Sequence, residues 1–475
     1  QQQQPVVAFR PDVDGNMAVF GTGGTGKSGA LRAIAIAAGF GTVRGGPTWV
    51  YGLDFGSRGL QPLAALPHVG SVIPGDDAER VQRLLRRLDA MIADRSVRYA
   101  QTESATITEY RQRTGRHDEP RVLVLVDGVG AFRAGYEGGL STRWWELFVR
   151  IAAEGRALGI HVVMSADRPT SVPSNLASSV QRELVLRLAS DIDHAMVDVP
   201  ADAYGPGTPV GRGFLDGREV QVAVIGGSAD LAEQGVAIQR CATAMLHSGV
   251  GTAPSIGSLP ARVALSDLPS EARRPTIGVA DDTLSAVGFV PGGVFLVAGV
   301  PQSGSSTTVA TMVRSLVAVE PDTDFVLLGK RRTPLASVGT WAVVAHGVTE
   351  IRQLASKLVG RVADAGREIV VVIEAVGELL DTEADAPVQE LVRVCRDQGV
   401  FVIAEGETSS LTGSWPLLQA VKSHRCGIVL QPDQMDGDML FKTPFPRTTR
   451  SEFPAGRGLM VQGGRVTKVQ VAVPE

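Results

Sequence analysis

The sequence predicts an α/β protein built from two consecutive copies of one module, each a mainly parallel β-sheet flanked by helices. Two glycine-rich loops share one frame, "GTGGTGKSGA" at residues 21–30 and "GVPQSGSSTT" at residues 299–308. The apolar and helical segments that follow each loop also come in the same order, which is typical of an internal repeat. With 475 residues the chain exceeds one typical domain, so two or three domains are expected.

Three further pairs of segments match between the two halves. They are "RVLVLVDG" (121–128) with "IVVVIEAVG" (369–377), "EGRALGIHVVMSADR" (154–168) with "VCRDQGVFVIAEGET" (394–408), and "GRGFLDGREVQVAVIGG" (211–227) with "GRGLMVQGGRVTKVQVAVPE" (456–475). We therefore predict modules at 1–247 and 276–475. The segment 248–275, rich in Gly, Ser and Pro, is the expected connector.

The short apolar runs of the first module predict strands that are buried on both faces. "MAVF", "PTWVYGL", "VLVLVD" and "HVVMSA" lack the alternation of a half-exposed strand, as in a parallel sheet covered by helices. Between them, residues 76–100 place apolar side chains at helical spacing, with Asp76 and Asp77 as N-cap candidates. In the second half, "TIGVA" is expected to be a strand that leads into the core.

Composition argues against several classes of protein. The 46 basic and 50 acidic residues give a net charge of −4, which does not favour a general nucleic-acid binder. The three cysteines are far apart in the sequence, so neither a zinc site nor a disulfide framework is predicted. No apolar run approaches the length of a membrane span, and because the chain opens on Gln1, we expect it to be a piece of a longer protein with upstream membrane segments.

The first glycine-rich loop fits the phosphate-binding pattern G-x-x-x-x-G-K-[ST] between a strand and a helix. Glycines allow backbone N–H groups to point at phosphate oxygens, Lys27 would reach the β- and γ-phosphates, and Ser28 would bind Mg²⁺. The predicted ligands are ATP and Mg²⁺. The predicted binding residues of the loop are Gly21, Thr22, Gly23, Gly24, Thr25, Gly26, Lys27 and Ser28.

Asp127, at the end of "VLVLVD", is the predicted second Mg²⁺ ligand. The next residue is Gly128, where hydrolytic members of this class of ATPase carry a glutamate that polarises water. ATP binding with weak hydrolysis is therefore expected. Asp167 is a candidate substitute for the base, and Arg156 and Arg187 are candidates for acting on a neighbour's phosphates, with an ordinary surface arginine as the alternative.

The second loop keeps both framing glycines, Gly299 and Gly304, and also Ser306, but has Ser305 in place of the lysine. Glu374 occupies the position of the Mg²⁺ carboxylate and Ala375 follows it, while Arg396 matches Arg156. Triphosphate affinity should fall here, because a charge-assisted contact is worth about 1.5–3 kcal/mol. This module is predicted to be a degenerate nucleotide site or a purely structural remnant.

These motifs resemble the FtsK/SpoIIIE ATPase family, and within it the C-terminal ATPase modules of type VII (ESX-like) secretion ATPases, EccC in actinobacteria and EssC in firmicutes. The resemblance is carried by "YGLDFGSRGLQPLAALPHVGSVI" (51–73), "EGRALGIHVVMSADRP" (154–169), "LRLASDIDHAMVDVPADAYGPGTPVGRGF" (186–214), and "ARVALSDLP" followed by "RPTIGVADDTLSAVGF". It covers nearly the whole chain, which looks like modules two and three of such a protein.

The resemblance implies RecA-like folds, assembly into a homo-oligomeric, hexameric ring, and recognition of secreted substrates of the WXG100 type. It also implies that these modules regulate an upstream ATPase module within a membrane secretion complex, at the cytoplasmic face of the membrane. The alternative is a DNA-translocating motor of the same family. That alternative is disfavoured because the chain is slightly acidic and ends in "VTKVQVAVPE" with no basic DNA-reading tail.

Overall fold

The computed structural model describes residues 5–41, 46–200, 203–205, 207–269, 274–329, 332–338, 341–365, 369–448 and 450–474. The chain divides into two compact units, Gln1–Gly257 and Ser258–Glu475, and the division falls within the segment 248–275 expected as connector. Gln1, from which we expect a longer parent chain, lies outside the described residues. In the part of the chain that is described, no helix is long and apolar enough to cross a membrane.

The first unit is built on a sheet whose described strands run in the order β3-β2-β4-β5-β1-β6-β7-β8. The first six in this order pair in parallel, whereas β7 and β8 add antiparallel pairs at one edge. Their bounds are β1 Asn16–Phe20, β2 Thr48–Asp54, β3 Val69–Pro74, β4 Arg121–Asp127, β5 Ile160–Ala166, β6 Val180–Leu186, β7 Arg212–Leu215 and β8 Arg218–Gln221.

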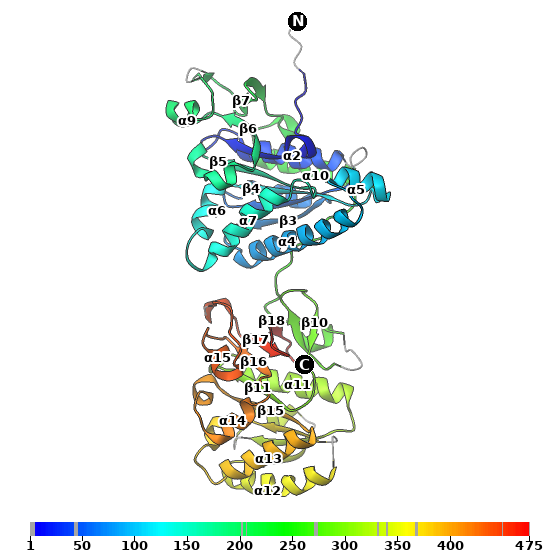
Figure 1. Ribbon diagram of the computed structural model, residues 1–475, viewed down its shortest axis with the longest axis vertical. Helices are drawn as coiled ribbons and strands as arrows, with labels where there is room; N and C mark the ends of the chain where they lie inside the picture. Colours follow the sequence, from blue (N-terminus) through cyan, green and yellow to red (C-terminus); the bar gives the residue numbers. More distant parts are fainter. Residues whose placement is uncertain are drawn as a thin grey trace. The chain divides into compact units, whose positions relative to one another are not determined.

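Helices cover both faces of this sheet, as Figure 1 shows. On β4, Val122 and Val124 pack into a core with α4, α6 and α7, while Leu123 and Leu125 pack with α2 and α10 on the other face. The predicted helix at 76–100 is α4, and the Asp77 side chain caps it by accepting from the Arg80 N–H. The described helices are α1 Pro11–Asp14, α2 Lys27–Phe40, α4 Ala78–Gln101, α5 Ile107–Thr114, α6 Val129–Tyr136, α7 Thr142–Glu154, α8 Ser174–Ala177, α9 Asp191–Ala195 and α10 Leu231–His247.

The second unit repeats this plan, with described strands in the order β10-β9-β18-β17-β16-β11-β15-β14-β12-β13. The predicted strand "TIGVA" is β9. The strands are β9 Thr276–Ala280, β10 Ala286–Gly288, β11 Val294–Gly299, β12 Asp324–Gly329, β13 Trp341–His346, β14 Ile369–Ile373, β15 Phe401–Glu407, β16 Gly427–Leu430, β17 Arg457–Gln462 and β18 Arg465–Val471. The helices are α11 Ser305–Val319, α12 Val348–Ala365, α13 Asp385–Gln398, α14 Pro416–Lys422 and α15 Asp436–Phe441.

The repeat predicted from the sequence is visible in the order of the strands. The strand before the first loop, β1, lies between β5 and β6, and the strand before the second loop, β11, lies between β15 and β16. Each sheet is mainly parallel and flanked by helices, so the predicted fold class is confirmed.

Asn16, at the start of β1, joins three segments in the interior of the first unit. Its amide donates to the carbonyls of Ala152 (2.7 Å) and Ser179 (2.9 Å) and accepts from the N–H of Val162 (2.8 Å). We predict that Asn16→Ala lowers the free energy of unfolding of the first unit by about 2–4 kcal/mol, because buried backbone groups lose their partners. Calorimetry should show this loss in the first unit's transition alone.

The matched control is Asn175→Ala, which alters an exposed asparagine of the same unit and should change stability by less than about 0.5 kcal/mol. A loss below about 1 kcal/mol for Asn16→Ala would contradict the structural role given to this side chain.

Candidate nucleotide site

The first glycine-rich loop joins β1 to α2 at the edge of the sheet where the parallel strands end. Gly26 adopts a left-handed φ of 107°, and a Cβ there would lie 3.1 Å from the backbone nitrogen of Gly211. The loop is held from outside: the Thr22 N–H donates to the Arg187 carbonyl (2.9 Å), and the Gly211 N–H donates to the Thr25 carbonyl (2.9 Å). The backbone N–H groups at the start of α2 therefore form a ready anion site.

Lys27, the first residue of α2, folds back over the loop. Its ammonium donates to the carbonyls of Gly21 (2.6 Å) and Thr22 (2.9 Å) and lies 2.9 Å from a carboxylate oxygen of Asp167. The lysine side chain is 12% exposed, whereas that of Asp167, which follows β5, is 75% exposed. A phosphate that enters the loop would have to replace Asp167 as the partner of Lys27.

Ser28 and Asp127, the two predicted Mg²⁺ ligands, lie in direct contact. The Ser28 hydroxyl donates to Oδ2 of Asp127 at 2.6 Å, and the Ser165 hydroxyl of β5 donates to Oδ1 at 2.5 Å. Ser165 in turn accepts from the N–H of Gly128 at 2.8 Å. A hydroxyl and a carboxylate, both at a phosphate loop, are the donor set that Mg²⁺ prefers beside a nucleotide, so the residues fit a magnesium ion.

Gly128 has no side chain that could act on a water molecule. Its backbone conformation and its surroundings disfavour a larger residue at this position. Its φ is +85°, and a Cβ would lie 3.3 Å from the carbonyl carbon of Phe55. A glutamate at this position would meet both a strained backbone and a close contact. Gly128 therefore places no carboxylate beside Asp127 at this position.

Asp54 and Arg32 are two further buried charged residues near the phosphate loop. Neither was predicted from the sequence. Asp54 ends β2 in register with Asp127, and it accepts from the N–H groups of Gly56 (3.2 Å) and Leu60 (2.8 Å). Burial raises the pKa of Asp54, and the nearby Asp127 adds to the rise, while burial lowers the pKa of Arg32. An acid at the end of "YGLD" was the signal available, as it was for Asp127.

The loop after Asp54 lies directly over the predicted metal ligands. A Cβ on Gly59 would stand 3.0 Å from the Ser28 hydroxyl and 3.4 Å from Oδ2 of Asp127. Arg32 holds this loop by donating to the Gly59 carbonyl at 2.7 Å. Asp54 and Arg32 thus position the loop that borders the metal site.

The two arginine candidates differ in their position relative to the phosphate loop. Arg156 precedes β5, at the opposite end of that strand from Asp167, and donates to the Val13 carbonyl at 3.1 Å. Arg187 has an exposed side chain, and it is its backbone carbonyl that holds the loop. Neither guanidinium is placed at its own chain's phosphate loop by any of these contacts.

The second loop has the same backbone but different side-chain partners. Gly304 has a φ of 101°, and the Gly456 N–H donates to the Ser303 carbonyl at 2.8 Å, as Gly211 does to Thr25. The Ser305 hydroxyl donates to Glu405 at 2.7 Å. Glu374, which directly follows β14, is buried, and Arg396 is paired with Asp397 on α13.

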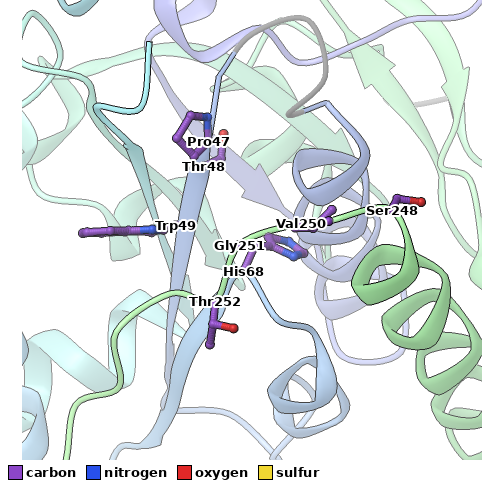
Figure 2. Close-up of a pocket in the computed structure, with 9 residues that line it drawn as sticks. Pro47, Thr48, Trp49, His68, Ser248, Val250, Gly251 and Thr252 are labelled. Carbon is purple, nitrogen blue, oxygen red and sulfur yellow. The ribbon is translucent and has the colours of Figure 1, made fainter. Parts of the chain in front are cut away.

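A cavity of about 340 Å³ lies elsewhere in the first unit. It is lined by the start of β2, by His68 and by residues 248–252, as Figure 2 shows. His68 Nε2 lies 2.8 Å from the Ala35 carbonyl, and burial lowers its pKa. The cavity lies where β2 begins, whereas Asp54 and the phosphate loop lie where the parallel strands end. The cavity and the loop are therefore at opposite ends of the strands.

Comparison with known sequences finds a family model that matches part of the chain. Residues 1–193 match the FtsK/SpoIIIE family. The matched residues lie within the first unit and make up less than half of the chain. The match confirms the resemblance noted from the sequence, and the matched residues include the loop that contains Lys27.

Curated relatives are type VII secretion proteins. The ESX-4 secretion system protein EccC4 of Mycobacterium tuberculosis is 26% identical over 99% of this chain and 39% of its own length. The ESX secretion system protein EccC of Thermomonospora curvata is 30% identical over 64% of this chain and 24% of its own length. The chain therefore spans well under half the length of either relative.

Solved structures with the same fold also come from this group. EssC ATPases 2 and 3 from Geobacillus thermodenitrificans superpose with a TM-score of 0.78 at 20% identity, covering 98% of this chain and 92% of that one. Thermomonospora curvata EccC ATPases 2 and 3, in complex with a signal sequence peptide, gives a TM-score of 0.70 at 24% identity, covering 98% of this chain and 90% of that one.

The ion pair between Lys27 and Asp167 predicts a competition with phosphate. Asp167→Asn should tighten ATP binding about two- to fivefold, because an exposed ion pair worth about 0.5–1 kcal/mol no longer has to be broken. Titration with a fluorescent ATP analogue in the presence of Mg²⁺ measures the change.

Asp118→Asn, at an exposed aspartate before β4, is the control and should leave affinity unchanged. Weaker binding by Asp167→Asn, or loss of hydrolysis, would instead point to a direct role of Asp167 with the nucleotide.

Proposed function

We propose that this chain is the ATP-binding distal part of a type VII protein-secretion ATPase, equivalent to ATPases 2 and 3 of EccC and EssC. The observation that carries the proposal is the complete phosphate loop of the first unit, with Lys27 over the loop and Ser28 bonded to Asp127. The EccC and EssC relatives support the assignment to secretion.

In this proposal the first unit holds MgATP. Ser28 and Asp127 would hold the ion, and bound Mg²⁺ neutralises charge on the β- and γ-phosphate oxygens. Lys27 leaves Asp167 for the phosphates, and the backbone N–H groups at the start of α2 bind the remaining oxygens.

Hydrolysis by the first unit alone is slow or absent in this proposal. Gly128 supplies no base, and Asp54 is engaged by two backbone N–H groups. ATP then acts mainly as a ligand that stabilises the unit by mass action.

The second unit is proposed to recognise the export signal of secreted WXG100-type proteins. It is the unit whose loop lacks the lysine, and the described part of it exposes large apolar side chains, among them Trp415, Met435 and Met439. Trp415 precedes α14, Met435 precedes α15, and Met439 lies within α15. Flexible methionines and an exposed tryptophan suit the apolar face of an amphipathic helix.

The remaining partners follow from the same assignment. The chain would work with an upstream ATPase module and a membrane secretion complex at the cytoplasmic face of the membrane, in a homo-oligomeric ring of six copies. In that setting the two units regulate the motor rather than drive it.

A titration with two probes tests the proposal. One probe is a labelled peptide with the C-terminal tail sequence of a WXG100-type substrate from the same genome, with a scrambled peptide as reference, and the other is double-stranded DNA at physiological salt. We predict tail-dependent peptide binding and feeble DNA binding. Trp415→Ala should weaken peptide binding about tenfold or more, as expected for an aromatic anchor that the bound peptide covers.

Val343→Ala, at an exposed apolar residue of β13, is the matched control and should bind the peptide as the unaltered chain does. Tight, salt-sensitive DNA binding without peptide binding would assign the chain to the DNA-translocating branch of the family instead.

A further inference from the structure

Glu405 of the second unit stands where the first unit has Ser165. In the first sheet, Val19 of β1 is in register with Ser165 of β5, and in the second sheet Val297 of β11 is in register with Glu405 of β15. Val19 and Val297 each lie two residues before the first glycine of their loop. The two side chains therefore start from the same point beside the two loops.

The Glu405 carboxylate keeps one of the hydrogen bonds that Ser165 makes in the first unit, and it adds a second one. Ser165 accepts from the Gly128 N–H at 2.8 Å, and Glu405 Oε2 accepts from the equivalent N–H of Ala375 at 3.0 Å. The other oxygen, Oε1, accepts from the Ser305 hydroxyl at 2.7 Å. Ser305 is the first residue of α11 and occupies the position of Lys27. Glu405 thus reaches from β15 to the start of the loop helix.

The helix that follows the loop is also less positively charged in the second unit than in the first. Lys27 and Arg32 of α2 correspond to Ser305 and Ala310 of α11, so two basic side chains are replaced by neutral ones. The helix N-terminus, which favours an anion, is now approached by a buried carboxylate of the protein itself, since Glu405 is 7% exposed.

We propose that Glu405 closes the second phosphate loop to nucleotide by serving as its internal anion. The carboxylate occupies the Ser305 hydroxyl at the start of α11 and repels a phosphate group, so the loop keeps its fold without a ligand. Only the first unit then responds to ATP. This inference rests on the proposed nucleotide role of the first loop.

The test exchanges the two residue pairs in the full chain. In a Lys27→Ala background, which silences the first loop, a fluorescent ATP analogue with Mg²⁺ is titrated against the background, Ser305→Lys, Glu405→Ser and the double variant. The double variant should bind about tenfold to a hundredfold more tightly than the background, since it regains a charge-assisted contact and loses the repulsion. Ser305→Lys alone should gain little, because Glu405 pairs with the introduced ammonium.

The reciprocal variant keeps the proposal falsifiable if the double variant unfolds, which thermal unfolding followed by circular dichroism would show. Ser165→Glu in the unaltered chain should weaken ATP binding at least about tenfold more than Ser165→Ala, which only removes the hydroxyl that donates to Asp127. The proposal is overturned if Ser305→Lys alone gains as much as the double variant, if a folded double variant gains nothing, or if Ser165→Glu binds normally. Failure of the unaltered chain to bind ATP would instead count against the proposed function.

Discussion

The carboxylate of Asp127 joins the three elements on which the first site depends. It ends β4, accepts the hydroxyl of Ser28 from α2, and accepts the hydroxyl of Ser165 from β5. Because it is buried, each lost contact would leave a polar group without a partner, and the three elements are therefore fixed relative to one another. This network positions the loop between β1 and α2. The loop that carries Gly59 packs against the same Ser28 and Asp127 side chains.

Comparison of the two units separates the features that the fold requires from those that ligand binding requires. Both loops keep a left-handed glycine before the helix and accept a backbone N–H from the strand-leading glycine, Gly211 or Gly456. The side chains above that backbone differ, with Lys27 and Asp127 in one unit and Ser305 and Glu374 in the other. The two loops thus share their backbone geometry, and side-chain charge decides what each loop can hold.

The sequence predicted the fold class, the buried strands and the long helix α4, because apolar runs, their periodicity and the N-cap Asp77 are local signals. It did not identify Ser165, Asp54 or Glu405 as part of the sites. Strand register places each of them: Ser165 pairs with Val19 and Glu405 with Val297, just before the two loops, and Asp54 pairs with Asp127. The contact between Lys27 and Asp167 was not predicted either, since Lys27 was expected to reach the phosphates and Asp167 was a candidate for the missing base.

The central claim is that the chain binds one nucleotide, in the first unit. Native mass spectrometry of the full chain with saturating ATP and Mg²⁺ counts the bound nucleotides directly. The account predicts one ATP per chain, and none after Lys27→Ala. Two nucleotides per chain, or one that persists after Lys27→Ala, would contradict it.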